Sequence, residues 1–213
     1  MKFGVVPLQD AKGAILAHSI ALPKGQLRKG VTPEADALHK LELAGISEVT
    51  VARLEPDDVH EDAAAELLAN ALVPNAKAAN LRLAPASTGR VNIFATEHGV
   101  AEIDASKIDA VNAVHPMVTV ATVPKWHRMA ARGMVATVKI ISYAVPHAVV
   151  TQAIAAGADA LGVRSVSRKR AALIQTQVGD SNEGSKGQRS MAMRFDRLSV
   201  TMGPKTVVPH RVD

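Results

Sequence analysis

The sequence contains no cysteine, and this absence removes several classes of functional site at once. Disulfide frameworks, cysteine-ligated zinc, iron–sulfur clusters and cysteine nucleophiles are excluded, and nothing in the chain requires an oxidising compartment. Aromatic residues make up only 2% of the chain, so small aliphatic side chains must fill the interior, as is typical of α/β packing. The same scarcity argues against nucleic-acid modules that stack bases on aromatic rings.

Long apolar runs and complete catalytic motifs are also missing. No segment approaches the roughly 18 consecutive apolar residues that a membrane span needs, and the first residues do not form a signal peptide. We therefore expect a cytoplasmic protein that makes no membrane contact. His60 lacks the second histidine of a zinc-binding helix, because Ala64 stands four residues later, and no serine–histidine–aspartate arrangement can be defined.

Positive charge is concentrated in the last quarter of the chain. Residues 161–213 contain 10 lysines and arginines against 4 acidic residues, whereas residues 1–160 contain 15 against 16. This asymmetry indicates an anionic partner for the last quarter, and the alternative is a solvated basic face. A second hypothesis is therefore a nucleic-acid-binding or regulatory module, which the scarcity of aromatics makes the weaker one. Its phosphate contacts would come from Arg168, Lys169, Arg170, Arg189, Arg194 and Arg197.

The spacing of apolar residues predicts short strands alternating with helices, and hence a mixed α/β fold. Strands are expected at 14–22, 46–54, 91–95, 100–103, 117–123, 134–144, 161–166, 171–176 and 205–208. Helices are expected at 33–44, from Pro56 onward, after the capping residue Asp104, and at 146–156 and 186–202. The order strand, polar loop, helix, strand in residues 161–213 is the opening of a parallel α/β domain. Such a domain usually needs roughly 100 residues or more, so we expect an incomplete one.

The stretch from Pro85 to Asp104 carries the first candidate site. Ser87-Thr88-Gly89-Arg90, at the start of a strand, offers hydroxyls, backbone N–H groups and a guanidinium, a combination that suits a phosphate or another planar anion. The alternative is an ordinary loop with a surface arginine. Further along, Glu97-His98-Gly99 predicts a hairpin turn between the strands 91–95 and 100–103, with Gly99 supplying the unusual backbone angles.

Lys139 lies near the middle of the most apolar predicted strand, 134–144. A lysine inside an apolar strand is costly unless its ammonium group reaches water or an anion. Lys139 is therefore a second candidate ligand residue. The alternative is an edge strand, from which Lys139 reaches water or which it protects against pairing.

Several stretches together resemble the amino-terminal part of molybdopterin-binding proteins of the MoeA-like type. They are LPKGQLRKGVTPEADALHKLELAGISEVTVARLEPDDVHEDAAAELLA, STGRVNIFAT, AEIDASKIDAVNAV and MVATVKIISYAVP. AALIQTQVGDS resembles the first strand and loop of the molybdopterin-binding domain of the wider family, and VVPHRVD resembles its second strand. The resemblance implies two domains: residues 1–160 as an α+β region with hairpins, and residues 161–213 as the beginning of a molybdopterin-binding-like α/β domain.

The resemblance implies a role in molybdenum cofactor biosynthesis. The chain would bind a pterin phosphate, or support molybdenum insertion or nucleotidyl transfer beside a nucleotidyltransferase partner. The residues expected to bind molybdopterin are Thr88, Gly89, Arg90, Asn92, Lys139, Thr176, Gly179, Asp180 and Ser181. Asp180 would hold Mg²⁺ through waters, and the alternative is that it caps a helix or turn.

Two departures from the family pattern limit what the resemblance implies. The family's first-strand loop reads Ser/Thr-Thr-Gly-Asp, whereas here Gln177 and Val178 separate Thr176 from Gly179. The later glycine- and threonine-rich loop has no counterpart, so we assign no catalytic residue and do not expect the isolated chain to be catalytic. A third hypothesis is a non-catalytic assembly subunit whose amino-terminal region forms a homodimer interface.

Overall fold

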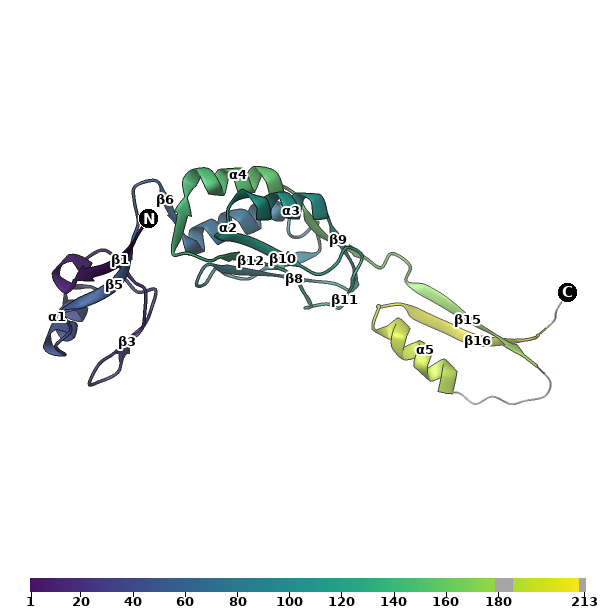
Figure 1. The fold of residues 1–213 in the computed structure, drawn as a ribbon. Helices are drawn as coiled ribbons and strands as arrows, with labels where there is room; N and C mark the ends of the chain where they lie inside the picture. The colour runs from purple at the N-terminus through teal and green to yellow at the C-terminus, as the bar shows by residue number, and fades with distance from the viewer. Residues whose placement is uncertain (179–185, 211–213) are drawn as a thin grey trace.

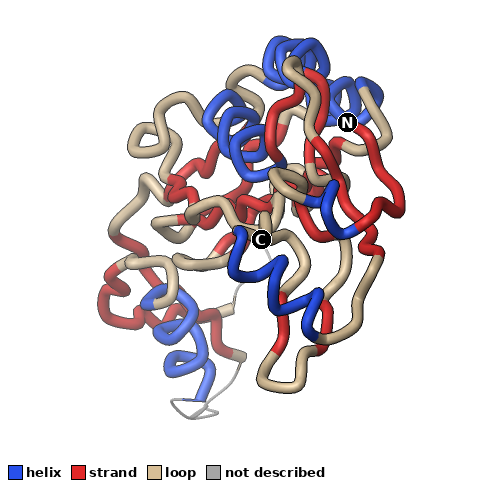
Figure 2. The backbone as a smooth tube through the Cα atoms, turned by 90° about the vertical axis from the view of Figure 1, so that its left-hand side faces the viewer, coloured by secondary structure: helices blue, strands red, loops and turns tan. Residues whose placement is uncertain are grey.

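The computed structural model describes residues 1–178 and 186–210. Three units follow one another along an elongated molecule (Figure 1): an N-terminal unit (1–55), a middle unit (56–166) and a C-terminal unit (from 167). Figure 2 views the molecule from the side on which the N-terminal unit lies in Figure 1, and helices and strands mix throughout. The predicted α/β class is confirmed.

The N-terminal unit is built on a small antiparallel sheet with the strand order β1-β5-β2. Its elements are β1 (Lys2–Pro7), a short 3-10 helix (Leu8–Ala11), β2 (Ile15–Leu16), β3 (Ile20–Ala21), β4 (Gln26–Leu27), α1 (Ala35–Leu43) and β5 (Glu48–Arg53). Alternation along β5 places Val49 and Val51 in a core with Leu41 of α1, as the sequence predicts. The strand expected at 14–22 is divided into β2 and β3, which belong to different sheets.

The middle unit contains two larger sheets, with helices that cover one face of the first. The first sheet has the order β10-β12-β8-β7, formed by Val118–Thr122, Met134–Ile140, Arg90–Ala95 and Leu81–Leu83. The second has the order β11-β9-β14, formed by Arg128–Met129, Gly99–Ile103 and Leu161–Ser165. A short pair joins β6 (Asp58–His60) to β13 (Ala144–Pro146). The helices, α2 (Glu61–Leu72), α3 (Ala105–Val114) and α4 (His147–Gly157), lie together above the sheets in Figure 1.

Period-two alternation fixes which face of the first sheet meets the helices. Val91 and Ile93 of β8 are fully buried, as are Leu68 and Leu72 of α2. Each such side chain stabilises the fold by about 1.5–3 kcal/mol relative to an exposed one. The opposite face is mixed: the cross-strand pairs Arg90–Lys139 and Asn92–Thr137 are polar, and the pair Phe94–Met134 is apolar.

The predicted hairpin at Glu97–Gly99 is wrong, because β8 and β9 belong to different sheets. Gly99 is required for a different reason than turn geometry: a Cβ atom there would collide with the backbone carbonyl of Arg164 on β14. Glycine thus permits the close approach of β9 and β14. The hairpin in this region joins β7 to β8 instead, and its turn lies at Thr88-Gly89.

Other boundaries also differ from the sequence prediction, among them the end of the helix expected at 186–202, which stops at Asp196. The helix expected from Pro56 begins only at Glu61, because residues 58–60 form β6 and pair with β13. Strand β14, which the sequence assigned to the second domain, pairs with β9. The sheet that begins in residues 1–160 is therefore completed by residues from the stretch 161–213.

The C-terminal unit is a strand–helix–strand arrangement of β15 (Arg170–Gln177), α5 (Lys186–Asp196) and β16 (Thr201–Pro209). Its two strands are parallel, as the sequence predicts. The expectation that residues 171–176 form a core strand is wrong: no residue of β15 is buried, and Ile174 is 67% exposed. Parallel strands are normally covered on both faces, and here α5 covers only one. In the part of the chain that the structure describes, every helix is too short or too polar to cross a membrane.

Candidate functional site

The Ser87–Arg90 segment forms a tight two-residue hairpin turn. Ser87 N–H donates to Arg90 O at 3.0 Å, and Arg90 N–H donates to Ser87 O at 3.1 Å. Thr88 and Gly89, the two central residues, have φ angles of 50° and 68°. Positive φ at both central positions defines a type I′ turn, whose twist matches that of the flanking strands.

Lys139 lies beside this turn, on a central strand. β12 is flanked by β10 and β8, so the alternative of an edge strand is wrong. Lys139 is 30% exposed at its side chain and lies opposite Arg90 in the strand register. Its ammonium group donates a hydrogen bond to the backbone carbonyl of Thr88 and lies 3.9 Å from Glu61 Oε2. The structure thus brings together Thr88, Gly89, Arg90 and Lys139.

Two carboxylates from the start of α2, Glu61 and Asp62, contact the polar groups of this cluster. Gly89 N–H donates to Asp62 Oδ1 at 2.6 Å, so it is bonded to a protein group. Among the described residues, Glu61 is the one charged residue that is buried. Burial raises the pKa of its carboxyl group, and the nearby Lys139 ammonium group opposes that rise. The N–H and ammonium groups that the sequence assigned to an external anion are therefore balanced within the protein.

Of the remaining predicted ligand residues, the structure describes Asn92 and Thr176. Asn92 is close by on β8, where its Oδ1 accepts a hydrogen bond of 2.7 Å from Thr137 Oγ1. Thr176 pairs with Val208 in the C-terminal unit, which Figure 1 shows beyond the opposite end of the middle unit from β6. Gly179, Asp180 and Ser181, including the suggested Mg²⁺ ligand, lie outside the described residues. Among the residues described, no group of three or more histidine or acidic side chains is placed to hold a metal ion.

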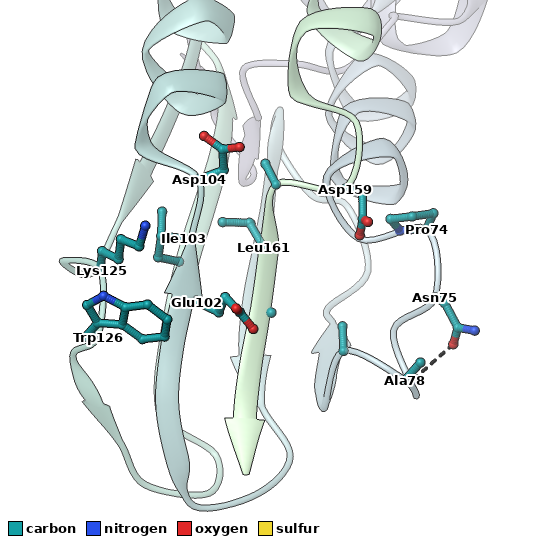
Figure 3. A pocket seen from close by; sticks show the side chains of 13 residues that line it. Pro74, Asn75, Ala78, Glu102, Ile103, Asp104, Lys125, Trp126, Asp159 and Leu161 are labelled. Atoms are coloured by element: carbon teal, nitrogen blue, oxygen red, sulfur yellow. Dashed lines mark hydrogen bonds between the residues drawn. The ribbon is translucent and has the colours of Figure 1, made fainter.

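A separate hollow lies in the middle unit, between the second sheet and the segments that follow α2 and α4 (Figure 3). Its volume is about 700 Å³, within the range of small-ligand sites. Trp126 and Lys125 stand on one side of the hollow, Pro74, Asn75 and Asp159 stand on the other, and Glu102 lies between them. Of the predicted ligand residues that the structure describes, none lines this hollow.

Trp126 is the only tryptophan of the chain, and it is half exposed. Its φ angle of 65° is unusual for a bulky residue, and its backbone N–H donates to the backbone carbonyl of Ala101 at 2.7 Å. The Lys125 ammonium and the Arg164 guanidinium lie 5.3 and 5.7 Å from its ring centroid. A strained backbone that holds an aromatic ring in contact with solvent is a reason to examine the site for function.

Three acidic side chains line the hollow, and they differ in how many hydrogen bonds or ion pairs already hold them. Glu102 forms an ion pair with Arg164, with a second contact of 3.3 Å from Arg164 Nε to Glu102 Oε2. Asp104 caps α3, and hydrogen bonds from the Ser106 hydroxyl and the Lys107 N–H lower the pKa of its carboxyl group. Asp159 is exposed, and within the described residues its carboxylate forms no ion pair.

Sequence reasoning missed this hollow because its parts are far apart along the chain. Asn75, Glu102, Trp126 and Asp159 come from four separate segments, and each stands in a connection or at a strand end. The available signal was Trp126, a single large aromatic residue in a polar connection. The scarcity of aromatics indicates aliphatic α/β packing and argues against base stacking, and neither inference concerns Trp126 itself. The arrangement can hold a flat ring against Trp126 while Asp159 accepts hydrogen bonds from ring N–H groups.

Comparisons with known proteins add no family to this description. No protein-family model matches the chain, and neither the curated proteins nor the solved structures contain a match.

Proposed function

We propose that this chain binds a pterin phosphate and acts in molybdenum cofactor biosynthesis in the cytoplasm, either presenting the pterin for molybdenum insertion or supporting nucleotidyl transfer by a partner. The observation that carries the proposal is the hollow at Trp126. A pterin is a flat bicyclic ring with several N–H donors, and its phosphate adds negative charge. The hollow offers an aromatic face, a carboxylate that pairs with no basic group of the described residues, and a lysine at its rim.

In this proposal each group has a separate task. Trp126 stacks on the ring, an interaction worth about 1–3 kcal/mol per ring in comparable stacking sites. Asp159 accepts hydrogen bonds from the ring N–H groups, and Lys125 lies where the phosphate enters. The likeness of the sequence stretches to MoeA-like proteins supports the choice of a pterin over other flat heterocycles. The chain's own residues supply binding and orientation here, and no catalytic residue is assigned.

The test is titration of the full chain with a stable phosphorylated pterin, followed by Trp126 fluorescence. Because the chain has one tryptophan, quenching reports on this hollow alone. Asp159→Asn removes one charge-assisted acceptor and should weaken binding about tenfold or more. Asp109→Asn, on the exposed surface of α3, is the matched control and should leave affinity unchanged. Calorimetry with Trp126→Leu checks the stacking contribution without using fluorescence.

Different results would separate the hypotheses. Absence of any pterin binding to the wild-type chain contradicts the proposed function. Loss of binding in Arg90→Gln, with Asp159→Asn unaffected, keeps the function but moves the ligand to the turn predicted from the sequence. Tight, steeply salt-dependent binding of an oligonucleotide in place of the pterin would favour the nucleic-acid hypothesis. A dimer in light scattering that binds none of these ligands would favour the assembly subunit.

A further inference from the structure

A second polar site begins on the outer face of the sheet β11-β9-β14. In the strand register Arg128 lies opposite Val100, and Val100 lies opposite Arg164. Cross-strand partners point to the same face, so both arginines stand on the outer side of the sheet, away from buried Met129 and Val163. Arg164 is already committed to Glu102 and to the ring of Trp126. Within residues 1–178 and 186–210, Arg128 has no ion pair or ring contact of this kind.

Arg128 instead lines a separate hollow of about 330 Å³ at the seam between the middle and C-terminal units. The same hollow is lined by Arg197, which follows the last residue of α5, and by His98, which precedes β9. Met129 and Leu198 supply apolar contacts. No acidic residue of the described segments lines this hollow, and Asp196 lines a different one.

Among the residues that the structure describes, no acidic side chain neutralises either guanidinium. Throughout residues 1–178 and 186–210, no carboxylate forms an ion pair with Arg128 or Arg197. Two positive side chains that line one hollow repel each other, and an anion between them converts that repulsion into two attractions. Arginine donors form paired hydrogen bonds to tetrahedral oxyanions, and the neutral or charged ring of His98 adds a further donor.

We propose that Arg128 and Arg197, with His98, form a binding site for a phosphate group at the seam between the middle and C-terminal units. The occupant is a phosphate monoester of a small molecule. A nucleic-acid backbone is disfavoured because Arg189 and Arg194, the two arginines of α5, do not line the hollow. This site is separate from the Trp126 hollow and stands without the proposed pterin function. A bound phosphate would also fasten the C-terminal unit to the middle unit, since each unit contributes one arginine.

The experiment is a titration of the full ¹⁵N-labelled chain with inorganic phosphate at constant ionic strength, followed by amide chemical shifts. The expected shifts are confined to the segments around His98, Arg128 and Arg197. Arg128→Gln and Arg197→Gln should each weaken phosphate binding about tenfold, because each removes charge-assisted hydrogen bonds. Arg189→Gln removes the same charge from α5, the helix that precedes Arg197, at a position outside the hollow, and it should change affinity by less than about twofold. All three arginines are exposed, so the variants should fold.

Several outcomes would overturn the site. They are the absence of saturable phosphate shifts in the wild-type chain, shifts centred elsewhere, and equal losses in all three variants, which would indicate a diffuse charge effect. Preference for a short single-stranded oligonucleotide over inorganic phosphate, with equal sensitivity to Arg189→Gln, would assign the surface to nucleic acid. Titration with an unphosphorylated pterin keeps the two proposals distinguishable. Its binding near Trp126 without phosphate binding at the seam would retain the proposed function and reject this site.

Discussion

Substitution of Gly89 by alanine tests the packing of the turn against the start of α2. The glycine has a φ angle of +68°, a region that side-chain-bearing residues rarely adopt. A Cβ atom placed there would lie 2.5 Å from Glu61 Oε2 and 2.6 Å from Ile140 O. The first contact is with a side chain that has little room, because Glu61 is buried, and the second is with backbone that cannot move independently of β12.

The magnitude follows from these two effects. An alanine at positive φ costs about 1 kcal/mol in backbone strain. The second effect falls on two hydrogen bonds: Ile140 N–H donates to Gly89 O at 2.7 Å, and Gly89 N–H donates to Asp62 Oδ1 at 2.6 Å. Displacing the turn weakens both bonds at a cost of about 2 kcal/mol. We therefore expect the free energy of unfolding of the middle unit to fall by about 3 kcal/mol.

Urea unfolding followed by Trp126 fluorescence measures this loss, because the tryptophan lies in the same unit as the turn. With a slope of about 2 kcal/mol per molar urea, the midpoint should fall by about 1.5 M. Gly162→Ala is the matched control, since a Cβ atom there has no neighbour within 4 Å. Alanine in a strand should leave that midpoint unchanged or raise it slightly. Equal midpoints for the two variants would refute the close packing of the turn against Glu61.

Three further predictions concern single side chains, and each is measured by urea unfolding. Burial raises the pKa of the Glu61 carboxyl group above its ordinary value of 4.5, so the folded protein binds the carboxyl proton more tightly than the unfolded chain does. The stability that this protonated group contributes is lost as pH rises through the raised pKa. Glu61→Gln should remove this decline, and an unchanged dependence of stability on pH would contradict it. Asn112 bonds both backbone groups of Val120, donating to O at 3.0 Å and accepting from N–H at 2.7 Å, so Asn112→Ala should cost about 1–3 kcal/mol, and a loss below about 0.5 kcal/mol would argue against these bonds. Ile174→Ser should change stability by less than about 0.5 kcal/mol, because the side chain is largely exposed, and a larger loss would mean that this face of β15 is covered in solution.

Local signals in the sequence were reliable wherever neighbouring residues decide the structure. Asp104 caps α3 as expected, because its carboxylate reaches the Lys107 N–H within the same turn. The alternation of Val91 and Ile93 predicted which face of β8 is buried. Gly99 shows the limit of such signals: its presence was detectable, but turn angles and close strand approach leave the same mark in a sequence.

The candidate sites were only partly predictable for a related reason. Thr88, Gly89 and Lys139 lie close together, and the acidic residues that balance them, Glu61 and Asp62, reach the turn only because α2 packs against β8 and β12. Without these acidic residues in view, the hydroxyl, glycine and basic groups of the local sequence predict a binding site for an external anion. The Trp126 hollow went unnoticed because no single segment contains enough of it to form a pattern.

By itself, the sequence determined the α/β class, most helices and strands, the parallel pair of the C-terminal unit and the exclusion of cysteine chemistry, because composition and short-range periodicity act within a few residues. Only the tertiary structure decided that β8 pairs with β12 and not with β9. It also decided that Glu61 and Asp62 contact Lys139 and the Thr88-Gly89 turn, and that Trp126 faces Asp159 across a hollow. Those outcomes depend on contacts between segments distant in the chain, and the free energy of such contacts comes from packing and charge pairing that no local pattern encodes.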